Sequence, residues 1–117
     1  MRFLSMVKID WDNPCQPTEK LMADMGRLIE EMTREGTLVQ TAGLKPAAEG
    51  VQVRLNKGGR ISVTDGPYAE AKEVVGGYAI LEAKSKAHAI ELTRRFLKVH
   101  GDDWDVSCEV RELESGC

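Results

Sequence analysis

The 117-residue sequence has few of the features that mark membrane, nucleic-acid-binding or metal-binding proteins. No apolar run approaches the roughly 20 residues that a membrane-spanning helix needs, so a membrane partner is not expected. Lys and Arg number 16 against 19 Asp and Glu, and without a basic stripe nucleic-acid binding has little electrostatic support. The two histidines have no partners at metal-ligand spacing and no Gly-rich phosphate loop is present, so no metal or cofactor is expected.

The cysteines are few and odd in number, and no two of them form a CxxC pair: Cys15, Cys108 and Cys117. An odd count, with a first segment that does not look like a secretion signal, favours free thiols in a reducing compartment. We therefore expect a soluble, cytoplasmic protein. Its length is close to that of a common domain and predicts one domain over residues 1–117.

Two segments have the apolar spacing of amphipathic helices. The first runs from Thr18 to Glu35 and is bounded by Pro17 and Gly36. Its apolar stripe comprises Leu21, Met22, Met25, Leu28, Ile29 and Met32. The second runs from Ser85, a suitable N-cap, to about Val99, and its apolar face comprises Ala89, Leu92, Phe96 and Val99.

The remaining patterned segments favour strands over residues 2–9, 38–42, 78–83 and 104–113. Between the second and third of these, residues 51–55 and 61–63 alternate around Asn56-Lys57-Gly58-Gly59, which indicates a β-hairpin. The order is strand, helix, strand, hairpin, strand, helix, strand. This order predicts an α+β protein with a ferredoxin-like split βαβ arrangement, an inserted hairpin, and two helices on one face of an antiparallel sheet.

Two of the expected strands are apolar on both faces. In the first, Phe3, Val7 and Ile9 alternate with Leu4 and Met6; in residues 78–83, Tyr78 and Ile80 alternate with Ala79, Leu81 and Ala83. The helices can cover only one face, and a large uncovered apolar face should pack against something else. The simplest cover is a second copy, so we predict a homodimer whose sheets face each other.

The run from Val63 to Tyr78 gathers the most reactive side chains between rigid elements. Asp65 ends an apolar strand, and a carboxylate against an apolar cleft can act as a general acid or base. Asp before Gly-Pro is also a common turn starter, which leaves a purely structural role open. Tyr68 could orient a substrate oxygen, or it could only pack its ring and leave the hydroxyl in water.

Four further charged residues are candidates for binding a small substrate: Arg54, Glu70, Lys72 and Glu73. Arg54 could bind a carboxylate in bidentate fashion, and the three others could form a charged rim around a pocket. Alternatively, Arg54 only forms an ion pair on a solvated strand face, and the three others belong to a solvated loop with weak surface ion pairs. Gly76 and Gly77 are expected to be structural, permitting close backbone approach or a bulge.

Much of the chain resembles the DGPF branch of the YCII-related family. The resemblance is carried by Val63 to Glu73, Gly76-Gly77-Tyr78, Val53-Arg54-Leu55 and Lys84-Ser85-Lys86. It implies a dimeric α+β barrel of ferredoxin-like subunits and a cleft near the Asp-Gly-Pro loop. The resemblance also implies that the protein is a small enzyme or a ligand binder, of a kind often encoded beside sigma factors. The wider family is thought to use a His-Asp pair with the His on the first helix, but here that helix has no His, and Tyr68 stands where the motif has Phe.

The function that these patterns favour is a cofactor-independent enzyme that performs proton transfer, such as an isomerisation or elimination, on a small organic substrate. Asp65 would be the acid or base, Tyr68 would orient an oxygen, and Arg54 with Lys72 would attract an anionic group. The alternative is a non-catalytic ligand-binding or regulatory module linked to sigma-factor signalling, in which Asp65 is a turn residue.

Overall fold

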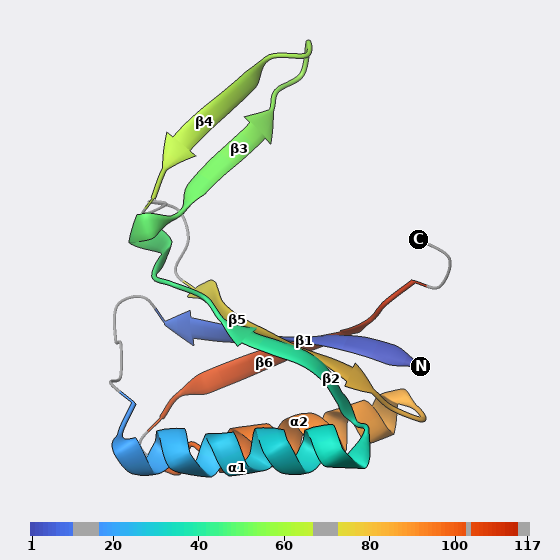
Figure 1. Ribbon diagram of the computed structural model, residues 1–117. Coiled ribbons are helices and arrows are strands. Elements are labelled where there is room, and N and C mark those ends of the chain that lie inside the picture. Colours follow the sequence, from blue (N-terminus) through green and yellow to red (C-terminus); the bar gives the residue numbers. More distant parts are fainter. Residues whose placement is uncertain (11–16, 67–72, 103, 115–117) are drawn as a thin grey trace.

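The computed structural model describes residues 1–10, 17–66, 73–102 and 104–114 (Figure 1). The main sheet contains β1 (Arg2–Asp10), β2 (Leu38–Gly43), β5 (Glu73–Glu82) and β6 (Val106–Glu112). The helices are α1 (Glu19–Glu35), α2 (Lys86–Lys98) and a short 3-10 turn, η1 (Ala47–Glu49). A separate hairpin, here called the arm (residues 51–65), contains β3 (Val51–Leu55) and β4 (Ile61–Asp65). Within the described ranges, no helix is long and apolar enough to span a bilayer.

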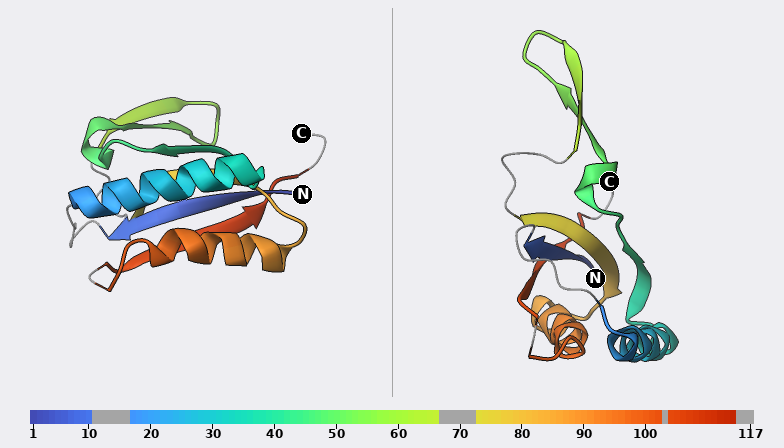
Figure 2. Two further views of the ribbon diagram at one scale, coloured as in Figure 1. Left: turned by 60° about the horizontal axis from the view of Figure 1, so that its bottom comes forward. Right: turned by 90° about the vertical axis from the view of Figure 1, so that its left-hand side faces the viewer.

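The main sheet has the strand order β2-β5-β1-β6, with antiparallel neighbours throughout. Each helix connects two strands that are separated by a third, as in a split βαβ unit. Both helices cover the same face of the sheet, and the arm rises on the opposite side (Figures 1 and 2). The mixed α+β arrangement agrees with the predicted ferredoxin-like fold.

The helix boundaries follow from capping residues. The Thr18 hydroxyl accepts a hydrogen bond from the Leu21 N–H at 3.1 Å, and the Ser85 hydroxyl accepts one from the His88 N–H at 3.1 Å. Gly36 ends α1 in the left-handed conformation, with φ of 81°. The predicted starts of both helices and the end of the first are therefore correct to within a residue.

The core lies between the helices and one face of the sheet. Its buried members include Phe3, Leu28, Met32, Leu38, Leu81, Ala89 and Leu92. The apolar stripe of α1 is narrower than predicted, because Met22 is 65% exposed. Successive helical residues are rotated by about 100°, so burial of Leu21 turns its neighbour Met22 toward solvent.

Strand β5 is longer than predicted, starting at Glu73 rather than Tyr78. Its pairing with β1 continues to Asp10 and Glu73, so Glu73 and the two valines before the Gly-Gly pair already belong to the sheet. The register shifts where Val7 pairs with Gly77 and Lys8 pairs with Val75, which leaves Gly76 as the extra residue of a bulge. Strand β6 is shorter than predicted, covering Val106–Glu112.

The opposite face of the sheet, here called the open face, presents the second apolar set of β1 and β5: Leu4, Met6, Tyr78 and Ile80. All four are half-buried within one chain. The Tyr78 hydroxyl accepts a hydrogen bond from Gln40 Nε2 at 3.1 Å. Neither of the two helices covers this face in any view (Figures 1 and 2).

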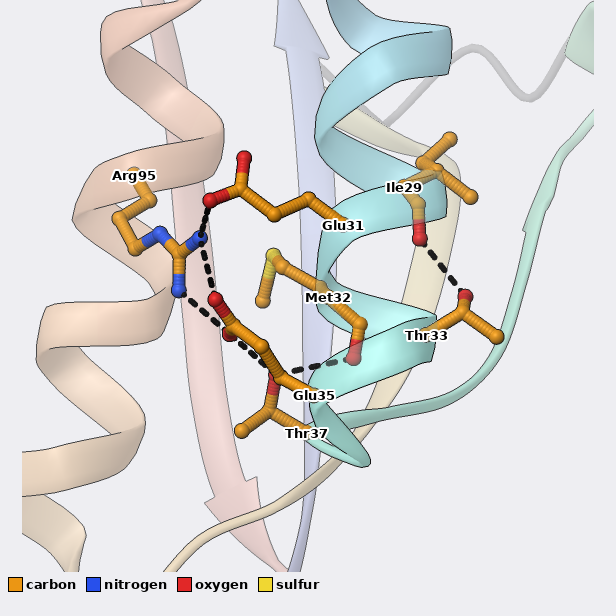
Figure 3. A network of polar contacts seen from close by, with 7 residues as sticks. All are labelled: Ile29, Glu31, Met32, Thr33, Glu35, Thr37 and Arg95. Atoms are coloured by element: carbon orange, nitrogen blue, oxygen red, sulfur yellow. Dashed lines mark hydrogen bonds and ion pairs between the residues drawn. The ribbon is translucent and has the colours of Figure 1, made fainter.

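An ionic contact ties the two helices together (Figure 3). Arg95 of α2 donates to both carboxylate oxygens of Glu35 in α1, at 2.9 and 3.3 Å, and lies 3.3 Å from a Glu31 oxygen. The hydrogen bond from Arg95 lowers the pKa of Glu35, and the same bond raises the pKa of Arg95. A two-pronged contact of this kind fixes the helix-to-helix geometry over the sheet.

The helix contact predicts a pH-dependent loss of stability in Arg95→Gln. Since the pKa of Glu35 is lowered by folding, its contribution is present above the ordinary carboxylate range and disappears as pH falls through the folded value. The thermal midpoint of Arg95→Gln should therefore lie below that of the wild type at pH 7, with the gap closing toward pH 3.

Arg94→Gln is the matched control, because Arg94 pairs with Glu91 of its own helix at 2.7 Å and bridges no second element. Its thermal midpoint should stay close to that of the wild type at both pH values. Equal losses in the two variants at pH 7 would contradict a bridging role for Arg95.

Candidate functional site

The Asp-Gly of the Asp-Gly-Pro motif forms the base of the arm. Asp65 is the last residue of β4, and the Gly66 N–H donates to the Gly50 carbonyl at 3.0 Å. A Cβ at position 66 would stand 1.9 Å from the Ala47 carbonyl oxygen. Only glycine can pass this close to the backbone of η1, so Gly66 has a clear structural reason to be there.

Asp65 lies on the apolar face of the arm. It pairs with Val51, and directly opposed residues of an antiparallel pair share a face. The same face carries five apolar side chains: Val51, Val53, Leu55, Ile61 and Val63. Each of them is between 54 and 70% exposed. The Asp65 carboxylate is exposed and belongs to an otherwise apolar surface.

Arg54 lies on the other face of the arm, opposite Ser62. It is exposed, and its neighbours on that face are the polar Gln52 and Thr64. One chain therefore does not bring Arg54 and Asp65 together on one surface. The remaining candidates Tyr68, Glu70 and Lys72 lie outside the described residues, as does the side chain of Glu73, whose backbone pairs with Asp10.

An open depression of about 560 Å³ adjoins the base of the arm. Its walls come from the end of β2, from η1 and from β5, and they include Ala47 and Gly50, the two residues that Gly66 contacts. Lys45 and Glu49 supply opposite charges to an otherwise mostly apolar lining. The depression can hold a small organic molecule, with a cation and a carboxylate available for its polar groups.

The Gly-Gly pair shapes the sheet beside this depression. A Cβ on Gly77 would lie 3.1 Å from the Ala42 carbonyl oxygen, and the Gly76 carbonyl accepts a hydrogen bond from the Leu44 N–H at 2.9 Å. The predicted structural role of the pair is confirmed, because one glycine forms the bulge and the other permits the close approach of β2.

A second depression, of about 240 Å³, opens on the helix side of Gly77 and is also lined by Thr41, Phe96 and His100. The His100 ring makes edge contacts with Phe96 and Trp104, at centroid distances of 5.6 and 5.5 Å. Its Nδ1 lies 3.2 Å from the Phe96 carbonyl, an arrangement that places the proton on Nδ1 in the neutral ring. The sequence analysis did not identify His100 as a lining residue, and the available signal was its position four residues after Phe96, at the end of the second helix.

The described part of the chain offers little for metal or thiol chemistry. Among residues 1–10, 17–66, 73–102 and 104–114, no three His, Cys, Asp or Glu side chains form a metal-binding group. Cys108 is a free thiol whose pKa is raised by burial, although a hydrogen bond with Ser5 opposes that shift. A raised pKa disfavours the reactive thiolate.

The contact at Gly66 predicts that Gly66→Ala loosens the arm without unfolding the sheet. The added methyl group cannot fit against Ala47, so the base must shift. A cost of roughly 1–3 kcal/mol is typical of such a backbone clash. Amide hydrogen exchange of residues 51–65 should therefore speed up by about ten-fold or more, while β1 and β5 keep their protection.

Gly43→Ala serves as the control, because a Cβ there would have open space and the backbone has no positive φ. Its exchange pattern should match that of the wild type. If arm protection survived in Gly66→Ala, the contact with Ala47 would not hold the arm in place.

The comparisons with known proteins agree with this fold. The search of curated proteins gives no match. A family model described as the YCII-related domain matches residues 1–100 of the 117, including both helices and the Asp-Gly-Pro motif. Because this match covers most of the sequence, the chain belongs to the YCII-related family.

Proposed function

We propose that the protein is a cofactor-independent enzyme that transfers protons on a small organic substrate, in an isomerisation or elimination, with Asp65 as the acid or base. The observation that carries this proposal is the position of Asp65. Its carboxylate is the charged group of an otherwise apolar face at the base of the arm, and the next residue, Gly66, contacts Ala47 and Gly50 in the wall of the depression. A carboxylate on an apolar surface can accept a proton from a bound substrate or return one to it.

The position of Lys45 supports one further role. Lys45 lines the depression and offers a cation for an anionic substrate group, which Arg54 cannot do on the Asp65 face of the same chain. In the proposal, Tyr68 orients a substrate oxygen, while Glu70, Lys72 and Glu73 form the charged rim. The favoured substrate class is therefore a small organic anion with an acidic C–H group.

A second candidate function is a non-catalytic binding or regulatory module, linked to sigma-factor signalling. The observation in its favour is the Gly66 contact, which explains the glycine of the Asp-Gly pair without chemistry. In that case, Asp65 only starts the turn, and the depression holds a ligand that is not converted. The two functions differ in what replacement of Asp65 should cost.

The enzyme proposal predicts that Asp65→Asn abolishes proton exchange but leaves the fold intact. A panel of small 2-oxo and 3-oxo acids in D₂O, followed by proton NMR, reports exchange of acidic C–H groups whatever product each compound would give. Wild-type protein should accelerate exchange for at least one compound. Asp65→Asn should lower that rate by about 10²–10⁴-fold, the usual contribution of a general base.

Asp105→Asn removes a different exposed carboxylate, placed before β6, and should leave the exchange rate unchanged. Equal rates in the wild type and Asp65→Asn would eliminate Asp65 as the base. If the wild type accelerated the exchange of no compound, and Asp65→Asn kept the wild-type thermal stability, the binding module would be favoured instead, since Asn can start the same turn.

We further propose that the chain belongs to the DGPF branch, that it lies in the cytoplasm and that it forms a homodimer as a dimeric α+β barrel. The free Cys108 supports a reducing compartment. The open face supports the dimer, since Leu4, Met6 and Ile80 remain half-exposed with neither helix over them. Two sheets packed face to face across a two-fold axis would bury them.

The proposed sheet-to-sheet contact predicts that Met6→Lys weakens the dimer. A cation in the sheet-to-sheet contact would be desolvated, and Glu109, the carboxylate opposite position 6, already pairs with Lys8, so the dissociation constant should rise by at least ten-fold. Sedimentation velocity over a micromolar dilution series measures this. Ala23→Lys adds the same charge to an exposed position of α1 and should leave the dissociation constant unchanged.

A further inference from the structure

The arm is the most unusual surface of the molecule. Its five apolar side chains project from one face, and the two-stranded hairpin stands apart from the sheet (Figures 1 and 2). The radius of gyration is 16.2 Å, whereas a compact domain of 100 residues has about 13 Å. An isolated two-stranded hairpin is at best marginally stable in water, so this one needs a cover.

We propose that the apolar face of the arm docks on a second copy of the chain, so that two arms embrace a dimer. Direction is the first argument. The arm rises on the side of the open face, away from the helices, which is where a second sheet would pack (Figure 1). A partner bound to the open face would therefore stand beside the arm.

Area is the second argument. The five side chains of the arm expose on the order of 300 Å² of apolar surface, whereas a standard stable interface buries about 800 Å² on each partner. Each apolar member of the open face is half-buried already and contributes less per residue than the arm. The arm alone is therefore too small for a standard interface, and a dimer that used both surfaces would bury more apolar area than one that used the open face alone.

Charge is the third argument. The arm carries Arg54, Lys57 and Arg60 against Asp65, a balance of +2 in a chain whose net charge is −3. The rest of the chain therefore carries −5. Although Arg54 lies on the face opposite the apolar one, the arm as a whole is cationic and is attracted to the anionic body of a second copy, which favours that occupant over an uncharged apolar partner.

The docked arm has a consequence for the site. Asp65 shares the apolar face with Val51, Val53 and Val63, so a second copy lying on that face would also border Asp65. The proposed acid or base would then be enclosed between two chains, and a single chain would hold an incomplete site. This consequence rests on the proposed enzyme activity, whereas the docking itself rests only on the proposed homodimer.

The test compares two substitutions in one strand of the arm. Val53→Asp places a carboxylate on the apolar face, and Gln52→Asp, its control, places one on the opposite face. Sedimentation velocity should show at least a ten-fold rise in the dimer dissociation constant for Val53→Asp and less than a three-fold change for Gln52→Asp. Circular dichroism should show the same secondary structure in both variants.

A second measurement remains decisive even if Val53→Asp disturbs the arm. Wild-type chains labelled with ¹³C are mixed with unlabelled chains, and isotope-filtered NOEs are recorded. Methyl groups of Val53, Leu55 and Ile61 should show NOEs to protons of the unlabelled chain. A wild-type monomer, or a dimer without such NOEs, would overturn the docking.

These outcomes separate the docking from the earlier proposals. If Val53→Asp leaves the dimer dissociation constant unchanged and Met6→Lys raises it, the sheet faces alone hold the dimer. That result would overturn the docking and support the sheet-to-sheet contact. Loss of proton exchange in Asp65→Asn, with the dissociation constant unchanged, would support the enzyme proposal whatever the arm does. Intermolecular NOEs from the arm without any exchange activity would support the docking and not the enzyme.

Discussion

The two central strands, β1 and β5, are apolar on both faces, and the rest of the structure depends on this constraint. One face of the sheet packs against α1 and α2, and Phe3, Leu81 and Leu92 in this layer are nearly inaccessible to water. The described part of the chain has no third layer for the other face, because the arm rises away from the sheet instead of folding onto it (Figure 1). The fold therefore leaves apolar surface uncovered in two places, and both places lie on the same side of the sheet.

Most of the fold could be predicted because the signals were local. Thr18, Gly36 and Ser85 mark helix ends through hydrogen bonds made within a few residues, and helical spacing identifies the faces that reach the core. The start of β5 was missed because the polar run up to Glu73 favoured a loop that ended only at the Gly-Gly pair, although two valines lie between them. Pairing with β1, which local sequence does not reveal, makes residues 73–77 part of the strand.

The candidate site could be predicted only in part. The alternation within each strand predicts that Asp65 shares a face with Val63 and that Arg54 lies on the face opposite its two apolar neighbours. Whether Asp65 and Arg54 share a face of the hairpin depends on the register between the two strands. That register is set by the turn at Asn56–Gly59, where two glycines have positive φ. No sequence pattern indicated that Lys45 and Glu49 line a depression, because η1 and the depression beside it form only when the base of the arm closes.

The Asp-Gly-Pro motif combines two constraints that the sequence alone cannot separate. Gly66 is required by the carbonyl oxygen of Ala47, so a motif of this kind would persist for the sake of the backbone even in a protein without activity. Asp65 is different, because its exposed side chain meets no such steric demand and faces an apolar surface. A structural turn would tolerate Asn at that position, since Asn can start the same turn, whereas proton transfer would not. The chemistry of position 65, rather than the presence of the motif, therefore separates an enzyme from a binding module.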